Sequence, residues 1–302
     1  MKKLTEKGGS MKITSDKLQV GDKYDSLVIK IDHEMNKQFL KALDEFHPRY
    51  NDIIHPGLLM SLCSITKSPS FNLSENVAAV GAKFECAYLC PTRVGKAFTF
   101  SWEVKEVIEK RSRIYQISDV LVTNEDGKNV MRRTINNTFI GGEHLKRRVE
   151  WERKTGFKRE YVTQSDFPKN GYEIVGKPKQ LTMEKLQYYS GGPIGPTWPV
   201  RNIHTDREIS IRSGIGKPIA SGMMFEAFMT ELMIDFFGDS WFEKGKMSVV
   251  CIEMAGDGDT IIPKAIITHK IFEESKSEIS MKLWCENQNR HAILIGSATY
   301  KM

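Results

Sequence analysis

The pattern of apolar and polar positions predicts the same order of helices and strands in the two halves of the chain. In the first half, β-branched and aromatic residues predict four strands, at residues 77–88, 97–108, 112–123 and 130–140. A short, very apolar segment at 58–65 precedes them and predicts a helix. Further upstream, an alternating segment at 23–31 predicts a strand, and Phe39, Leu40 and Leu43 lie on one face of a helical segment.

The second half shows the same order. An extended segment at 172–175 and a helical one at 183–189 come first, and a glycine- and proline-rich loop follows at 190–199. The apolar segment 223–237 predicts a longer helix. Four strands are expected after it, at 249–254, 265–272, 277–285 and 292–300. An apolar helix followed by an antiparallel meander indicates a sheet wrapped around that helix, so the fold class expected is α+β with an internal duplication.

A charged stretch with little periodicity separates the two copies. We interpret residues 143–165 as a linker, which leaves an N-terminal domain at 11–142 and a C-terminal domain at 166–302. A chain of 302 residues agrees with two domains of ordinary size.

Composition excludes several classes of protein. With 40% apolar and 27% charged residues, the chain is typical of a globular protein. The net charge of +6 is mild and no recognition motif accompanies it, so we expect no nucleic-acid partner. We also expect no membrane span and no signal peptide. The five cysteines are irregularly spaced, which predicts reduced thiols in a cytoplasmic protein without a metal site.

Three short motifs in the second half carry the candidate chemistry: Tyr189-Ser190-Gly191, His204-Thr205-Asp206 and Ala220-Ser221-Gly222-Met223. They resemble the signature of the MaoC-like, (R)-specific enoyl-thioester hydratases. That signature runs Tyr-Ser-Gly-Asp, then Asn-Pro-x-His-x-Asp, then a His-Gly or Ser-Gly pair that opens the central helix. The resemblance covers most of the chain and implies a double hotdog, in which each half is an antiparallel sheet around a central apolar helix.

The chain departs from this family pattern at two places. Gly192 stands where the family has its catalytic Asp, and Arg201-Asn202 stands where it has Asn-Pro. An insertion at 193–199 lengthens the link between the first two motifs. The usual carboxylate of the Asp/His pair is therefore missing at its expected place.

The first half carries a degenerate copy of the motif. Tyr50 takes the position of the His, and His55-Pro56-Gly57 aligns with Ala220-Ser221-Gly222. The resemblance implies that such a half shapes the acyl pocket and completes the fold. The active centre is then expected in the second half.

The chemistry of thioester hydration explains the residue types in the motif. A base must accept a proton from water, and donors must stabilise the enolate oxygen. A histidine ordinarily titrates near neutrality, so His204 is the candidate acid/base, and the N–H of Gly222 at a helix N-terminus is the candidate oxyanion donor. Asp206 is the third catalytic candidate, and Glu226 is another carboxylate that could replace the missing Asp. The expected substrate-binding residues are Tyr50, Tyr189, Gly192, Trp198, Asn202 and Met223.

The function expected is a hydratase or dehydratase of fatty acid or polyketide metabolism, acting without a cofactor. Its substrate would be an enoyl or 3-hydroxyacyl thioester of coenzyme A or an acyl carrier protein, and the protein could form a homodimer. Two alternatives remain open. One is a diverged hotdog enzyme, namely an isomerase, eliminase or cyclase of a tailored acyl or polyketide substrate. The other is a non-catalytic double hotdog that acts as a binding or structural subunit.

Overall fold

In the part of the chain that the structure describes, the first half forms five strands and two α-helices. The computed structural model describes residues 13–75, 77–110, 113–141, 171–191, 200–273 and 276–301. The elements of the first half are β1 (Leu27–Lys30), α1 (His33–Leu43), α2 (Pro56–Leu62), β2 (Val77–Tyr88), β3 (Ala97–Lys110), β4 (Arg113–Asn124) and β5 (Asn129–Gly141).

The second half follows the same plan with a longer central helix. It begins with β6 (Glu173–Val175), β7 (Lys179–Gln180), α3 (Met183–Leu186) and a π-helical turn (Gln187–Gly191). Next come α4 (Arg207–Arg212), α5 (Gly222–Phe237) and α6 (Trp241–Lys244). The strands β8 (Gly245–Cys251), β9 (Thr260–Glu273), β10 (Lys276–Asn287) and β11 (Ala292–Lys301) complete it.

The strands of both halves form one antiparallel sheet. Its order is β1-β3-β4-β5-β2-β8-β11-β10-β9-β6, with β7 paired to β9. The order reads as the same run of five strands on either side of a central junction, where β2 pairs with β8 from Lys83↔Val250 to Ala87↔Lys246. The expected α+β architecture with a duplicated plan is thus confirmed.

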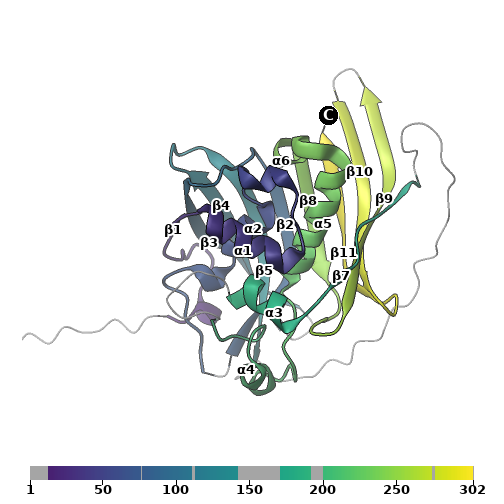
Figure 1. Ribbon diagram of the computed structural model, residues 1–302. Helices are drawn as coiled ribbons and strands as arrows, with labels where there is room; N and C mark the ends of the chain where they lie inside the picture. The colour runs from purple at the N-terminus through teal and green to yellow at the C-terminus, as the bar shows by residue number, and fades with distance from the viewer. Residues whose placement is uncertain are drawn as a thin grey trace, which may run out of the picture.

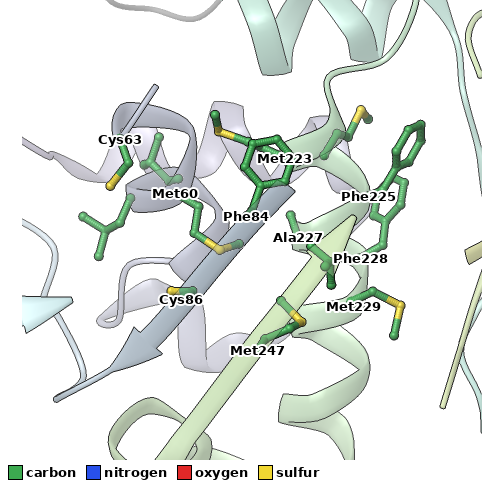
Figure 2. Close-up of a cluster of buried hydrophobic side chains, with 14 of the residues drawn as sticks. Met60, Cys63, Phe84, Cys86, Met223, Phe225, Ala227, Phe228, Met229 and Met247 are labelled. Carbon is green, nitrogen blue, oxygen red and sulfur yellow. The ribbon is translucent and has the colours of Figure 1, made fainter. Parts of the chain in front are cut away.

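Helix α5 is the core of the second half. Its residues from Met223 to Ile234 are all buried, since the sheet covers it on one side and α2 packs against it on another. Figure 1 shows α2 and α5 near one another at the centre of the molecule. The two helices approach closely at Gly57, where an added Cβ would lie 2.8 Å from the Cβ of Ala227. The methionine and phenylalanine side chains of α5 fill this core (Figure 2).

A buried ion pair links the two halves beside this core. Arg133 of β5 donates from Nη2 to Oε2 of Glu226 in α5 at 2.7 Å, and both side chains are fully buried. Glu226 therefore neutralises an arginine of the first half, and it does not line the cavity described below. A second ion pair, between Lys179 and Glu231 at 3.0 Å, connects α5 to the segment that contains β7.

Some expected elements differ in position. The strand expected at 249–254 runs instead over Gly245–Cys251, because the chain leaves the sheet after Cys251, where the N–H groups of Ile252 and Glu253 both donate to the carbonyl of Ile293. The helix α4 was not expected, since its short sequence is mostly polar. The linker expected at 143–165 lies outside the described residues, as do the insertion at 193–199 and Gly192. Within the described part of the chain, no helix is both long and apolar enough to cross a membrane.

Candidate active site

The loop that carries His204 is built around Asn202. The side-chain Oδ1 of Asn202 accepts a hydrogen bond from the His204 N–H at 2.8 Å, and its Nδ2 donates to the carbonyl of Ser190 at 3.0 Å. Thr205 Oγ1 accepts from the Asn202 N–H at 3.0 Å and donates to the carbonyl of Val200 at 2.7 Å. These bonds fix the backbone from which the His204 ring projects.

The His204 ring is held in one tautomer. Its Nδ1 lies 2.8 Å from the carbonyl oxygen of Ile219, and because a carbonyl only accepts, Nδ1 carries the proton. Burial lowers the pKa of His204 to about 4, with a smaller lowering from Lys67, while the bond to Ile219 opposes the shift. His204 is therefore neutral at pH 7, and Nε2 is its basic nitrogen.

The N-terminus of α5 supplies backbone donors. Ser221 caps the helix, with Oγ 3.4 Å from the Met223 N–H, and Gly222 is the first helical residue. Among the residues that the structure describes, none accepts a hydrogen bond from the Gly222 N–H. A side chain at Gly222 has no room, because an added Cβ would lie 2.4 Å from Cys251 Sγ and 2.9 Å from the Phe84 ring. The glycine therefore lets the helix start between β2 and β8.

His204 and the start of α5 line one cavity of about 90 Å³ between the two halves. His204, Gly222 and Met223 contribute from the second half, whereas Phe84 and Asn137 contribute from the first. Figure 2 shows Phe84 reaching from β2 toward Met223 at the start of α5. The cavity brings a neutral imidazole and a free backbone donor to the same space.

Two further titratable groups line this cavity. Glu253 is exposed and lies just after β8, and Cys251 ends that strand. Burial raises the pKa of the Cys251 thiol to about 12, so it remains protonated at pH 7 and is no thiolate nucleophile. Of these lining groups, His204 and Glu253 remain able to accept a proton from water, and His204 also lies in the loop fixed by Asn202.

Asp206 has a different role from the one expected of a catalytic residue. Its carboxylate caps α4 by accepting from the Ile209 N–H at 3.0 Å and pairs with Arg201 Nε at 2.5 Å. The Arg201 guanidinium, together with that capping bond, lowers the pKa of Asp206 to about 2. Asp206 is absent from the cavity lining, and its bonds organise the segment after His204.

The two tyrosines proposed as substrate-binding residues are packed inside the protein. Tyr189 is buried, with its ring 5.1 Å from that of Phe39, and Tyr50 is buried with its ring 4.8 Å from that of His55. Neither lines the cavity, and Asn202 does not line it either. Of the proposed substrate-binding residues, the structure places Met223 there; Gly192 and Trp198 lie outside the described residues.

Three residues that line the cavity from other elements belong to none of the motifs found in the sequence. Phe84 and Asn137 come from β2 and β5, and Glu253 follows β8. The pairing of distant strands brings these residues to the cavity, and a single sequence contains no local motif for such pairing. The one sequence signal for Asn137 is that it is a polar residue among apolar residues on the inward-facing side of its strand.

Solved structures resemble this chain over nearly its full length. No protein-family model and no curated sequence matches it. A structure described as a MaoC-like dehydratase has a TM-score of 0.70 at 15% identity and covers 94% of this chain and 98% of its own. A MaoC-like dehydratase from Phytophthora capsici has a TM-score of 0.66 at 12% identity, with 96% and 98% covered.

A third structure carries the name of the fold. It is a conserved hypothetical protein from Mycobacterium tuberculosis, described as having a double hotdog fold, with a TM-score of 0.65 at 9% identity, covering 95% of this chain and 98% of its own. At such identities the likeness establishes the fold. The chain therefore has the double-hotdog fold of the MaoC-like dehydratases, as its motifs predicted.

Proposed function

We propose that this protein adds water to a 2-enoyl thioester, or removes it from a 3-hydroxyacyl thioester, carried by coenzyme A or an acyl carrier protein. One observation carries the proposal: a neutral imidazole with a defined tautomer and a free helix N-terminal N–H line the same cavity. Two structural relatives are described as MaoC-like dehydratases, which agrees with this chemistry.

The residues of the cavity account for the full reaction in the hydration direction. Nε2 of His204 accepts a proton from water while the water oxygen bonds to C3 of the enoyl group. The electron pair of the C2–C3 double bond moves toward the carbonyl, and the Gly222 N–H donates to the thioester oxygen as charge develops there. The His204 imidazolium then returns the proton to C2, so the step balances without a second carboxylate or a cofactor.

Three features of the described chain support the proposal. The first concerns the compartment, and the other two concern the reaction. The five cysteines are unpaired, as expected for cytoplasmic thiols. A cavity of about 90 Å³ remains beside His204, which favours an enzyme over a non-catalytic double hotdog whose side chains fill this space. The depressed pKa keeps His204 in the base form over the whole neutral range. The homodimer stays a prediction.

The experiment is a panel of 2-enoyl and 3-hydroxyacyl thioesters, on coenzyme A and on an acyl carrier protein, with mass spectrometry reading gain or loss of water. His204→Ala is the test variant, and His269→Ala, at an exposed histidine of β9, is the matched control. A mass change of one water that depends on His204 supports the proposal. Conversion without net water change favours the diverged isomerase or cyclase, and a protein inert toward every thioester favours the non-catalytic subunit.

A further inference from the structure

Asn137 has a buried amide nitrogen without a partner among the described residues. It lies in β5 of the first half with 4% of its surface exposed, and it lines the cavity that contains His204. Its Nδ2 has no hydrogen-bond partner in the described ranges. Buried polar groups in proteins are nearly always hydrogen-bonded, so an unpaired amide beside a cavity indicates a ligand atom that completes it.

The strand register directs this side chain toward α5. Arg133, Ile135 and Asn137 alternate along β5 on one side of the sheet, and Arg133 on that side contacts Glu226 of α5. Asn137 is paired with Gly81 at a β-bulge in β2, a place where strands often redirect side chains near active sites.

Phe84 connects the surroundings of Asn137 with the start of α5. An added Cβ at Gly81 would lie 2.4 Å from the Phe84 ring, and one at Gly222 would lie 2.9 Å from the same ring. Gly81, the strand partner of Asn137, and Gly222, the first residue of α5, therefore contact a single side chain. The Phe84 ring therefore lies against both places, and Asn137 and Gly222 line the same cavity.

The inference rests on the proposed function. We infer that Asn137 is the second oxyanion donor of the site, with its amide N–H donating to the thioester oxygen alongside the Gly222 N–H. Because Nδ2 has no partner among the described residues, its N–H groups are available to that oxygen. The first half then contributes a catalytic group, although its own copy of the motif is degenerate.

The test compares Asn137→Ala with Asn136→Ala, a matched asparagine on the same strand that points to the other side of the sheet. Removal of one oxyanion donor lowers kcat by about 10²–10³-fold. We expect that loss in Asn137→Ala, mainly in kcat rather than KM, because the charge on the oxygen develops in the transition state. Asn136→Ala should match the wild type.

A second measurement separates a catalytic from a structural role. Because Nδ2 of Asn137 has no partner among the described residues, Asn137→Ala should melt at the same temperature as the wild type or higher. A variant that keeps wild-type kcat overturns the inference, as does one that loses activity together with a large drop in Tm.

The same variants distinguish failure of this inference from failure of the proposed function. If the wild type turns over no thioester, the proposed function fails, and binding of saturated butyryl-coenzyme A by calorimetry decides the inference. Weaker binding by Asn137→Ala, about tenfold or more, with unchanged binding by Asn136→Ala supports the amide as a ligand for the thioester oxygen. Equal binding by all three proteins, or no binding by the wild type, overturns it.

Discussion

The two central helices begin in different ways, and the difference concerns the backbone N–H groups that each helix start presents. α5 begins with Ser221 as its cap and Gly222 as its first residue, which leaves the Gly222 N–H free. α2 begins with His55 as its cap and Pro56 as its first residue, and proline has no N–H. The next donor, the Gly57 N–H, is bonded to His55 Nδ1 at 3.0 Å. The start of α2 thus lacks the free N–H that Gly222 presents at the start of α5.

The histidines near the two helix starts are opposite tautomers. His55 Nδ1 accepts a hydrogen bond, so the neutral ring carries its proton on Nε2, which is buried without a partner. His204 Nδ1 donates to a carbonyl, so its basic nitrogen is Nε2. His55 is sealed between Phe39 and Tyr50, whereas His204 lines a cavity. A neutral histidine is therefore a structural element in one half and a candidate base in the other.

The largest expected effect comes from deleting the two histidines separately. His204→Ala should lower turnover of an enoyl thioester by about 10²–10⁴-fold with the fold intact, because the base is lost. His55→Ala should keep its turnover per folded molecule and lose about 0.5–2 kcal/mol of stability, because a helix cap is lost. Steady-state kinetics and urea unfolding check both. Equal loss of turnover in the two variants contradicts the assignment of the base to His204.

The next test transfers a feature of the first half into the second. Gly222→Pro gives α5 the same first residue as α2 and removes the N–H, and Gly222→Ala introduces a Cβ but retains it. Both variants press on Cys251 and Phe84, so the packing strain is largely shared. We expect kcat of the proline variant to be about 10²–10³-fold below that of the alanine variant. Similar kcat values would rule out the Gly222 N–H as a donor.

A smaller effect is expected from pH. Because the pKa of His204 is lowered to about 4, kcat/KM should stay level from neutral pH down to about pH 5 and fall about tenfold per unit below pH 4. An acid limb near the ordinary histidine pKa of about 6.5 would contradict this environment.

Stability should respond to pH over a different range. Burial also lowers the pKa of His55, to about 3, so both histidines stay neutral in the folded protein where the unfolded chain binds protons. Their contribution to stability is therefore present above about pH 6.5 and is lost as the pH falls toward 4 and then 3. Urea midpoints measured from pH 7 to pH 4 check this sign, and His55→Asn should flatten the dependence without moving the acid limb of kcat/KM.

The smallest effect is expected at Asp206. Asn caps helices about as well as Asp, so Asp206→Asn preserves the start of α4 and removes an exposed ion pair with Arg201. Turnover and Tm should both remain close to the wild-type values. A loss of turnover as large as that of His204→Ala would place this carboxylate in the chemistry after all.

Local sequence patterns predicted most of the fold because they report on periodicity. The strand 77–88 agrees with β2 residue for residue, and the helix expected at 223–237 begins one residue earlier. The start of β8 was misplaced, since its first residues are fixed by pairing with β2 rather than by their own apolarity. Pairing between distant strands leaves no local pattern in a single sequence.

The candidate site also has a part that local motifs predicted and a part that depends on pairing between distant strands, which they could not predict. His204 and Gly222 lie within short motifs next to a helix start, where chemistry and local structure coincide. Tyr50 and Tyr189 lie within or beside the same motifs, yet their rings pack into the core, because an aromatic residue near a site is also good core material. Asn137 is more than sixty residues from His204 in sequence and reaches the cavity through the sheet alone.

The ion pair between Arg133 and Glu226 favours pairing of a first half with a second half over pairing of two identical halves. Each half contributes one charge, and both charges are buried only when a first half meets a second half. Two first halves joined through β2 would leave two arginines without a carboxylate, and two second halves would leave two glutamates without a cation. Because an unpaired buried charge destabilises a protein by several kcal/mol, the pair disfavours self-association of either half.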